Sequence, residues 1–506
     1  MVVVGSTWSS SQARFVGFAT FGALLHVVSQ LIDQYVPQPY MDEIFHVPQA
    51  QAFCRGQWQH WDDKITTFPG LYVAAVGINS VASRMFGDGY GSCSVSALRS
   101  VNLLFSFATA IVLERFMHAR RALAADSLGH SGAAAPWLRA LALAMFPPHF
   151  FFAFLFYTDA ISTFFVLLTL KLFDDAARCG GHGCSGVLGA TLAAGSGTLS
   201  IACRQTNAVW LIFGAGAFVV ADLEGTHGEQ LIRSGADVGN GQRDGQGLLP
   251  APAVVLRCAS LVWKEWRRLQ HRVLPALLVA LAFVVFVVWN KGIVVGDRSN
   301  HTMVLHFAQL GYFSVFAASY LAALHRPSAL WRNTADLVAE VSRRKFMTCV
   351  VVIVIASLLW FGSPTHPFIL ADNRHYTFYV WKAFFRRHRF AKLLPLPAYA
   401  TAAWLLSRAL RLRSSAKMEV ASRPVSSLWL LGFVVALSLV LVPAHLVEPR
   451  YFLVPFFIVH VHAEPASPFH TCLLLLAGVV VNAVVLGVFI FRPFTWPDES
   501  VARFMW

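Results

Sequence analysis

Long apolar runs recur from one end of the chain to the other, with short polar segments between them. Most runs are close to the roughly 20 residues that an α-helix needs to cross the hydrocarbon core of a bilayer. The runs lie at residues 14–36, 97–117, 137–156, 160–174, 187–203, 208–221, 273–289, 302–325, 346–362, 392–411, 425–443, 449–462 and 469–491. The alternating ten-residue segments of a transmembrane β-barrel are absent. We therefore predict an all-α polytopic membrane protein with about 12 to 14 membrane helices.

The composition supports a membrane protein. Of the 506 residues, 56% are hydrophobic and 13% are charged, whereas a soluble protein carries about 25% charged residues. The first run continues into LIDQYVPQPY, residues 31–40, without a small-residue cleavage site, so we predict a retained span and not a signal peptide. Eight cysteines are too few for a disulfide scaffold. We predict a single membrane-embedded domain over residues 1–506.

The formal net charge is +14. In a soluble protein such an excess of Lys and Arg suggests nucleic-acid binding, but the cytosolic loops of a membrane protein collect the same residues. We therefore expect the lipid bilayer as a partner, and no nucleic acid.

The polar segments are of two kinds. One kind is basic and includes residues 222–272; the other is rich in Asp, Asn, His, Tyr and Trp and includes residues 37–96. If the N-terminus is cytosolic and Gly70–Phe86 forms a helix that does not cross, the two kinds lie on opposite sides of the membrane. Most loop Lys and Arg residues are then cytosolic, as the positive-inside rule expects. The arginine cluster at residues 386–389 is an exception, because it falls on the non-cytosolic side. Residues 37–96 become a first non-cytosolic loop with amphipathic or re-entrant helices.

Two charged residues lie within apolar runs, Asp159 in FLFYTDAISTFF and Arg204 in SIACRQTNAVW. Charged side chains at bilayer depth are costly and persist mainly where they line a cavity. The competing interpretation is that each lies at a helix end and extends to water. Several polar segments on the same side of the membrane favour a shared cavity.

The densest polar segment is PYMDEIFHVPQAQAFCRGQWQHWDDKITTFPG, residues 39–70. A carboxylate within hydrogen-bond reach of a substrate hydroxyl can act as a general base. Asp42 and Glu43 are adjacent, and helical neighbours point about 100° apart, so we expect only one of them to face a shared site. Trp61 can stack on a sugar or lie in the membrane interface, and Asp62 is a further candidate carboxylate.

A metal site is a weak hypothesis. MDEIFH is not a DxD pattern, and His46, four residues after Asp42, is a single potential partner. The CGGHGC segment at residues 179–184 has three soft ligands but no second Cys or His pair, so we predict a loop. The sequence also has no phosphate-binding loop and no dinucleotide fingerprint. An enzyme of this kind needs a donor substrate that the membrane delivers.

Several cationic residues in the second kind of segment can bind a phosphate. They are Arg204, Lys291, Arg298, Arg374 and Arg450. Acids lie close to some of them in the sequence, as in GDRSNH, ADNRH and VEPRY. Ion pairing is therefore an equally plausible role for part of the set.

Long motifs occur along the whole chain. They are YMDEIFHVPQAQAFC with ITTFPGLY downstream, RQTNAVW, GIVVGDRS, LADNRHYTFYVWK, EPRYFLVP and RFMW. Together they resemble the α-1,2-glucosyltransferase family of the endoplasmic reticulum, which adds the last glucose to the lipid-linked oligosaccharide used for N-glycosylation. The resemblance runs in the same order from Tyr40 to Trp506. The N-terminal tail and residues 222–252 do not match.

The resemblance implies a GT-C fold, with the active site on the lumenal face of the endoplasmic reticulum membrane. It implies dolichyl phosphate glucose as the donor. The acceptor it implies is a dolichyl-pyrophosphate-linked oligosaccharide that already carries two glucoses. The family inverts the anomeric centre, and enzymes of this type are expected to work without a metal or another cofactor.

This chemistry needs a base for the acceptor 2-hydroxyl and cations for the departing phosphate. It needs no general acid, because phosphate is a good leaving group. By the resemblance, Asp42 is predicted to be the base, with Glu43 as the alternative. The predicted donor-phosphate and substrate-binding residues are Arg204, Arg298, Arg374, His375, Arg450, Asp159, Trp61 and Asp62.

Three other classes fit part of these observations: a transporter, a regulatory membrane subunit, and a sister hexosyltransferase that uses another lipid-phosphate sugar. The two halves of the chain show no internal repeat, which disfavours a transporter. A regulatory subunit would tolerate mutation of the loop acids. The NHT triplet at residues 300–302 is a glycosylation acceptor, but it abuts the next span and we expect it to be unmodified.

Overall fold

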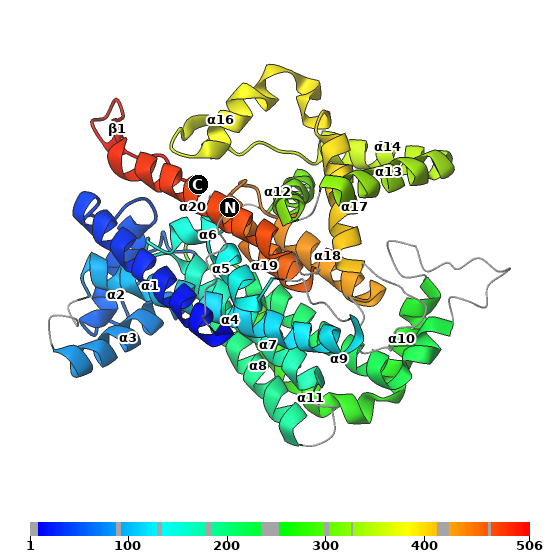
Figure 1. Ribbon diagram of the computed structural model, residues 1–506. Coiled ribbons are helices and arrows are strands. Elements are labelled where there is room, and N and C mark those ends of the chain that lie inside the picture. Colours follow the sequence, from blue (N-terminus) through cyan, green and yellow to red (C-terminus); the bar gives the residue numbers. More distant parts are fainter. Residues whose placement is uncertain are drawn as a thin grey trace.

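The computed structural model describes residues 9–87, 93–128, 134–178, 184–233, 252–297, 303–324, 327–411, 425–463 and 467–506. These residues are helical almost throughout, with one small antiparallel sheet (Figure 1). The elements are α1 (Ser10–Tyr35), α2 (Glu43–Cys54), α3 (Gly70–Phe86), α4 (Val95–Leu128), α5 (Pro136–Ala144), α6 (Pro147–Phe152), α7 (Thr158–Arg178), α8 (Cys184–Cys203), α9 (Asn207–Arg233), α10 (Pro252–Lys264), α11 (Trp266–Trp289), α12 (Ala308–Leu324), α13 (Pro327–Arg343), α14 (Lys345–Phe361), α15 (Pro367–Ala371), α16 (Tyr376–Ala383), η2 (Phe385–Arg387), η3 (Arg389–Leu393), α17 (Leu396–Arg411), α18 (Ser427–Leu441), η5 (Pro449–Phe452), α19 (Leu453–His462), α20 (Pro468–Phe491), β1 (Phe494–Thr495) and β2 (Val501–Ala502). The predicted all-α fold is confirmed.

Six of the described helices are long and apolar enough to cross a membrane, so the chain is a multi-pass membrane protein. They are α1, the Val95–Arg120 part of α4, the Gly186–Cys203 part of α8, the Asn207–Gly228 part of α9, α11 and α20. A seventh span results if α13 and α14, bent by 104° at their junction, count as one. By length and composition, the predicted 12 to 14 membrane helices are too many for the described residues. The reason is that several apolar runs form shorter helices, such as α12 with 17 residues and α18 with 15.

The predicted span at residues 137–156 is also wrong, because this run forms two short helices, α5 and α6. The break falls at Met145, two residues before a Pro-Pro pair. Proline lacks the N–H that would continue the helix, and it disfavours helical backbone in the residue before it. The Met145 carbonyl accepts a hydrogen bond from Asn482 Nδ2 of α20 at 2.8 Å. Gly478 lets α20 approach, since a Cβ there would lie 3.1 Å from the same carbonyl oxygen.

The segment that contains this break forms the centre of the fold. Every residue from Arg139 to Thr163 is buried. Phe146 stacks on Phe456 of α19 with ring centroids 3.7 Å apart, and α4, α7 and α20 pack around the same segment. Its last part carries Tyr157 and Asp159, so the packing of the core determines where these two side chains lie.

The first loop forms a layer of its own against the core, with α2 and α3 at the left of Figure 1. Its apolar side chains, among them Val47, Phe53 and Leu71, form one cluster. A distant segment docks on this loop, because the Asp297 N–H donates to the Asp63 carbonyl at 2.7 Å.

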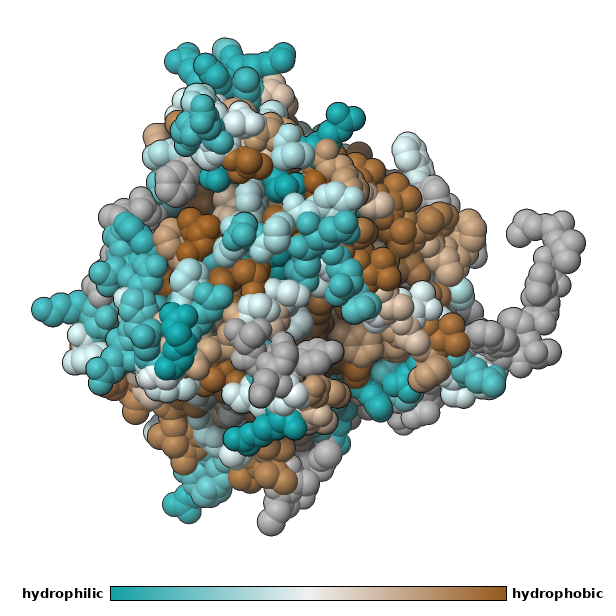
Figure 2. Space-filling view, turned by 90° about the vertical axis from the view of Figure 1, so that its left-hand side faces the viewer, coloured by the Kyte–Doolittle hydropathy of each residue, from teal (hydrophilic) through white to brown (hydrophobic). Residues whose placement is uncertain are grey.

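Exposed apolar side chains are numerous on α11 and α14. Figure 2 shows the side of the molecule where α2 and α3 lie, and there hydrophobic areas alternate with hydrophilic ones. Large exposed apolar areas are unfavourable in water and favourable in a bilayer. The exposed apolar surface of α11 and α14 is therefore suited to contact lipid, and the hydrophilic areas are suited to contact water.

Candidate active site

Five charged side chains from distant parts of the chain meet beside the end of the buried central segment. They are Asp42 before α2, Asp159 in the first turn of α7, Arg204 after α8, and Glu448 and Arg450 at η5. We call this set the ion-pair cluster. It brings together four of the residues that the sequence singled out as candidates, and it adds Glu448.

Asp42 supplies the accessible carboxylate of the cluster. Its backbone N–H donates to the Tyr157 hydroxyl at 3.0 Å, and its Oδ2 accepts a hydrogen bond from Arg450 Nη1 at 3.1 Å. Met41, directly before it, has a left-handed φ of 55°, a costly conformation that persists mainly at functional sites. The Asp42 side chain is 40% exposed, so a substrate can reach it.

Glu43, the neighbouring acid, is completely buried. Its oxygens accept hydrogen bonds from Arg99 Nε at 2.9 Å and Arg99 Nη2 at 2.6 Å. They also accept the backbone N–H groups of Phe156 at 2.6 Å and Tyr40 at 3.0 Å. These bonds attach the chain before α2 to α4 and to the central segment. Only one of the two adjacent carboxylates therefore faces the cluster, as the helix geometry predicts.

Arg450 lies at the centre of the cluster. Its Nη1 is 3.1 Å from Asp42 Oδ2 and 3.8 Å from Asp159 Oδ2, and its Nε donates to Glu448. The Tyr157 ring lies 5.5 Å from its guanidinium. Burial lowers the pKa of Arg450, but the three carboxylates outweigh burial and raise it well above the usual value. Arg450 is therefore a permanent cation.

The same contacts keep Asp42 ionised. Burial raises the pKa of the Asp42 carboxyl, whereas Arg450 and then His46 lower it more strongly. The net result is a pKa below the ordinary value of an aspartate. At neutral pH the side chain is a carboxylate, the form that a general base requires.

Asp159 and Arg204 form a second ion pair beside the first. Asp159 is buried in the first turn of α7, where the helix dipole favours a negative charge. Its Oδ1 accepts a hydrogen bond from Arg204 Nη1 at 2.5 Å. Its Oδ2 has no hydrogen-bond partner among the described residues, although Arg450 lies nearby. The structure thus brings together the two charged residues of the apolar runs.

The segment Asp372–His375 approaches the cluster from another direction. Arg374 donates from Nε and Nη2 to the two Asp372 oxygens at 2.9 and 2.7 Å. Its guanidinium lies 4.4 Å from the centre of the Trp496 ring. His375 is close enough to Asp42 to contribute to the lowering of its pKa. His375 is therefore within electrostatic reach of Asp42, and Arg374 directly precedes it in the chain.

The sequence interpretation missed two residues beside Asp42. Nδ1 of His46, one helical turn after Asp42, lies 2.6 Å from the Tyr72 hydroxyl, and the His46 ring is edge-on to Tyr157 at 6.0 Å. Burial lowers the pKa of His46, so its imidazole is neutral at neutral pH and becomes a cation, the form that lowers the Asp42 pKa, only in acid. The four-residue spacing from Asp42 was a usable signal, but it was considered only for a metal. Tyr72, in α3, is the last residue of the ITTFPGLY motif, but it was not considered as a site residue.

Trp61 and Asp62 have contacts within the first loop. Trp61 packs edge-on against Tyr72, with ring centroids 5.9 Å apart. The Asp62 N–H donates to Gln49 of α2, and its carboxylate accepts the Lys64 N–H. None of these contacts involves the ion-pair cluster. Arg298 and the glycosylation triplet at residues 300–302 lie outside the described residues.

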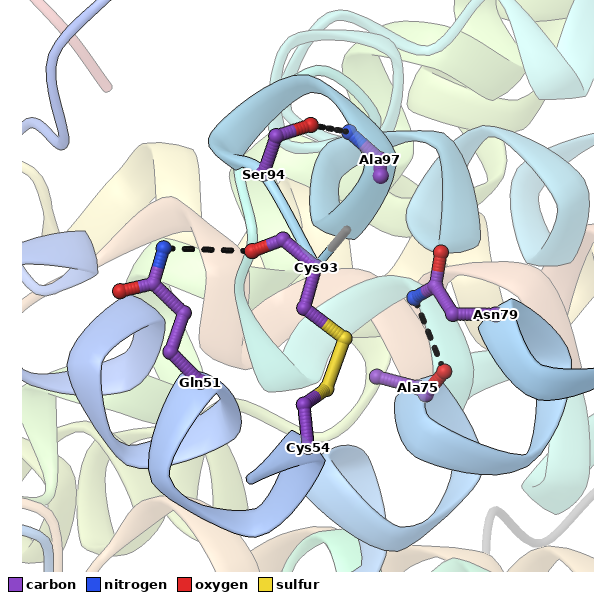
Figure 3. Close-up of a disulfide and its surroundings, with 7 residues drawn as sticks. All are labelled: Gln51, Cys54, Ala75, Asn79, Cys93, Ser94 and Ala97. Atoms are coloured by element: carbon purple, nitrogen blue, oxygen red, sulfur yellow. Dashed lines mark hydrogen bonds between the residues drawn. A yellow bond between two sulfur atoms is a disulfide. The ribbon is translucent and has the colours of Figure 1, made fainter. Parts of the chain in front are cut away.

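A disulfide joins Cys54, the last residue of α2, to Cys93, two residues before α4 (Figure 3). Beside it, Gln51 Nε2 donates to the Cys93 carbonyl at 3.2 Å. The end of α2 opposite Asp42 is thereby attached to the helix that carries Arg99. The cysteine count argued against a disulfide scaffold but gave no signal for a single pair.

The three carboxylates of the cluster converge on an arginine. In the part of the chain that the structure describes, no group of three His, Cys, Asp or Glu side chains is arranged to hold a metal ion. The arrangement can accept a proton at Asp42 and bind an anion at the neighbouring arginines.

The fold and the site together define a class, that of multi-pass helical membrane proteins with a carboxylate and several arginines gathered where loops and helix ends meet. Residues 36–461 match the DIE2/ALG10 family. Because this match covers most of the chain, the protein belongs to the DIE2/ALG10 family. No solved structure matches it.

Several curated proteins are similar over nearly their whole length. A mouse protein is 36% identical over 485 residues, which cover 93% of both chains. A human protein is 34% identical, again over 93% of both chains, and an Arabidopsis thaliana protein is 30% identical over 95% of this chain and 97% of its own. Each of the three is named Dol-P-Glc:Glc(2)Man(9)GlcNAc(2)-PP-Dol alpha-1,2-glucosyltransferase.

Proposed function

We propose that the protein transfers glucose from dolichyl phosphate glucose to a dolichyl-pyrophosphate-linked oligosaccharide that carries two glucoses. The acceptor atom is the 2-hydroxyl oxygen of the terminal glucose. The near full-length similarity to glucosyltransferases of that name supports the reaction. The observation that carries the proposal is the accessible, ionised Asp42, whose Oδ2 lies 3.1 Å from Arg450 Nη1. A second ion pair, between Asp159 and Arg204, lies beside it.

In this reaction Asp42 is the general base. It accepts the proton of the acceptor hydroxyl while the hydroxyl oxygen forms a bond to C1 of the donor glucose. The bond between C1 and the phosphate oxygen breaks, and dolichyl phosphate leaves with the electron pair. The developing negative charge on the phosphate is stabilised by arginines held in place before the reaction, an arrangement that lowers the barrier.

The contact between Asp42 and Arg450 links donor binding to the strength of the base. Without donor, Arg450 lowers the pKa of Asp42, so the carboxylate is a weak base. A donor phosphate competes with the carboxylates for the N–H groups of Arg450. The Asp42 pKa then rises, and the carboxylate becomes a stronger base when the donor is in place.

Inversion requires the base and the leaving group on opposite faces of the sugar. Arg374 and His375 come from a different segment than Asp42, and we assign them to the phosphate side of the sugar. Arg204, paired with Asp159, completes the set of cations. Arg298 remains a candidate phosphate ligand from the sequence.

We also place the site in the lumen of the endoplasmic reticulum. The Cys54–Cys93 disulfide lies in the first loop, and disulfides persist in oxidising compartments such as this lumen. Tags for N-glycosylation inserted in the first loop should be modified, and tags inserted within residues 234–251 should not. Modification of the second set alone would contradict this orientation.

We further propose that no metal takes part, because the arginines supply the positive charge that the leaving phosphate needs. Transfer should continue at an unchanged rate in excess EDTA. Loss of activity in EDTA that is restored by Mg²⁺ or Mn²⁺ would show that the arginines are not sufficient.

The reaction itself is tested with the full-length protein in microsomes that lack the endogenous activity. Dolichyl phosphate glucose and the diglucosylated acceptor are supplied, and the product is digested with linkage-specific glucosidases. We expect one added α-1,2-linked glucose. Movement of the lipid-phosphate sugar across the membrane without transfer would instead support a transporter.

A further inference from the structure

The last residues of the chain, Phe494–Trp506, lie along the segment that carries Arg374 and His375. In Figure 1 the red β1 region lies close to the yellow chain that leads to α16. We call Phe494–Trp506 the C-terminal segment. All four residues from 373 to 376 contact it, although more than a hundred positions of sequence separate the two.

Trp496 contacts two of these residues. Its indole Nε1 donates to Asn373 Oδ1 at 2.9 Å, and its ring centre lies 4.4 Å from the Arg374 guanidinium. Stacking on an aromatic ring holds a guanidinium plane in one orientation and leaves its N–H edges free for an anion. Asp372 binds one edge of Arg374, so the orientation of this arginine is determined from two sides.

The backbone of the C-terminal segment pairs with the same residues. The Met505 N–H donates to the Arg374 carbonyl at 2.9 Å, and the Tyr376 N–H donates to the Met505 carbonyl at 3.3 Å. Between them, His375 Nδ1 lies 2.8 Å from the Trp506 carbonyl oxygen. The other ring nitrogen, Nε2, lies 3.8 Å from Asp372 Oδ2. Met505 itself is almost completely buried.

The C-terminal segment is also attached to the chain that leads to Asp42. The Tyr40 hydroxyl donates to the Arg503 carbonyl at 2.8 Å, and it accepts the Arg503 N–H at 2.7 Å. The Arg503 guanidinium donates to the Phe489 carbonyl at 2.7 Å and to the Tyr35 carbonyl at 3.1 Å. It therefore joins the ends of α20 and α1, and the RFMW motif at residues 503–506 connects two sides of the site.

We infer that the C-terminal segment positions the donor phosphate, because the segment fixes the positions of Arg374 and His375 relative to Asp42. Trp496 and Arg503 are positioning residues, which act through their contacts with Arg374 and Tyr40. The inference rests on the proposed function. The inference extends the proposed function by giving two residues a role. Trp496 orients a phosphate-binding arginine, and Arg503 fixes the distance between the base and the phosphate.

The test compares steady-state kinetics of full-length variants in microsomes. Trp496→Ala removes both the stacking and the hydrogen bond, so the KM for dolichyl phosphate glucose should rise about tenfold, the effect of about 1.4 kcal/mol. Trp496→Phe keeps an aromatic face and should show a smaller rise. The KM for the acceptor should not change in either variant. Val501→Ala, at an exposed position of the same hairpin, is the matched control and should behave as wild type.

Arg503→Ala should lower kcat because base and phosphate are no longer held at a fixed spacing, and Arg503→Lys should recover part of the loss. Equal changes in both KM values and in kcat for every variant would indicate general destabilisation and overturn the inference. An unchanged donor KM in Trp496→Ala would overturn it as well.

A second measurement does not depend on transfer activity. Hydrogen–deuterium exchange of the peptide containing residues 373–376 should be faster in Trp496→Ala than in wild type and unchanged in Val501→Ala. If wild type transfers no glucose, the proposed function fails while this comparison still reports on the positioning contacts. Unchanged exchange in Trp496→Ala would contradict those contacts.

Discussion

Asp42 and Glu43 are chemically alike, and their surroundings give them different roles. Asp42 is 40% exposed and touches one arginine that other acids share. Glu43 is fully buried, and Arg99 together with two backbone N–H groups occupies its oxygens. A carboxylate with free acceptor positions can take a proton from a substrate, whereas one whose positions are all used stabilises the fold.

Asp42→Asn should reduce transfer by about 10² to 10⁴-fold, the usual contribution of a positioned general base. The unfolding temperature should change little, because the amide is similar in shape and partly exposed. The comparison is made on initial rates with saturating donor and acceptor. A variant with full rate would show that another group is the base.

The pH dependence of transfer follows from the lowered pKa of Asp42. Because the folded-state pKa lies below the ordinary value of about 3.9, the carboxylate is ionised from neutral pH down to that range and is protonated only below it. kcat/KM should therefore show no acid limb from Asp42 between about pH 5 and 7. In Arg450→Gln, the arginine no longer counteracts the effect of burial on Asp42, so the pKa of Asp42 should rise. The acid limb of the pH profile should then shift to higher pH. A wild-type midpoint near pH 6 would contradict the assignment.

Glu43→Gln should act on stability, and on activity only through it. The substitution removes the fully buried carboxylate partner of Arg99 and leaves it only the partly exposed Asp33, so we expect a loss of up to about 3 to 5 kcal/mol, the range for breaking a buried ion pair. A thermal-unfolding series in detergent measures this effect. Arg14→Gln, which removes a more exposed ion pair with Glu114, is the control and should shift the midpoint much less.

At the scale of elements, irregular backbone brings the site together. The Pro-Pro break after α5 and the non-helical stretch before α7 turn the central segment, so that Tyr157 and Asp159 lie at its end. The Met145 carbonyl at the break is bonded by Asn482. A polar side chain in an apolar helix thus satisfies a backbone group that hydrocarbon could not.

Asn482→Leu should destabilise the protein by about 1 to 2 kcal/mol, because the Met145 carbonyl loses its partner in a buried place. Val484→Ala, at an exposed position of the same helix, should have a much smaller effect. Both are compared by their unfolding midpoints in the same detergent. Equal unfolding midpoints for the two variants would show that the hydrogen bond makes no net contribution to stability.

The helices show most clearly how much of the structure can be predicted from the sequence. Hydropathy predicts a helical membrane protein because apolar length is a direct consequence of bilayer thickness. It fails at residues 137–156, where composition stays apolar but Pro-Pro interrupts the helix. Of the site, residue types and positions singled out Arg204 and Arg450 among several cations, whereas Asp42 was preferred over Glu43 by the family resemblance. Their pairing was not predictable, because contacts between residues hundreds of positions apart depend on the packing of the whole bundle.

At the scale of the molecule, a disulfide within the first loop and ion pairs with Arg99 of α4 fix the position of α2. The Cys54–Cys93 disulfide closes a sequence separation of 39 residues. Arg99 binds Glu43, the first residue of α2. The loop that carries Asp42 is therefore held at both ends of α2.

Removing the disulfide should lower the stability of this loop. For a closed loop of this length, the entropy model gives about 4 kcal/mol. Cys54→Ser should therefore lower the temperature at which transfer activity is lost, and dithiothreitol should do the same to wild type. Cys472→Ser removes an exposed free thiol and is the control. Equal heat resistance of Cys54→Ser and wild type would argue against a stabilising role.

The contact between Asp42 and Arg450 joins residues 408 positions apart, and that between Tyr40 and Arg503 joins residues 463 positions apart. During synthesis the first loop exists long before the residues that complete the site. A chain that stops early has the base but lacks Arg450 of η5. Activity thus appears only when the whole chain has been made and assembled.

The same separation makes the enzyme divisible. A chain interrupted between residues 233 and 252 would leave Asp42, Asp159 and Arg204 on one polypeptide, with Arg374 and Arg450 on the other. Neither piece alone holds a complete site. Glucose transfer by the two pieces together would then report that they have met and packed within one membrane.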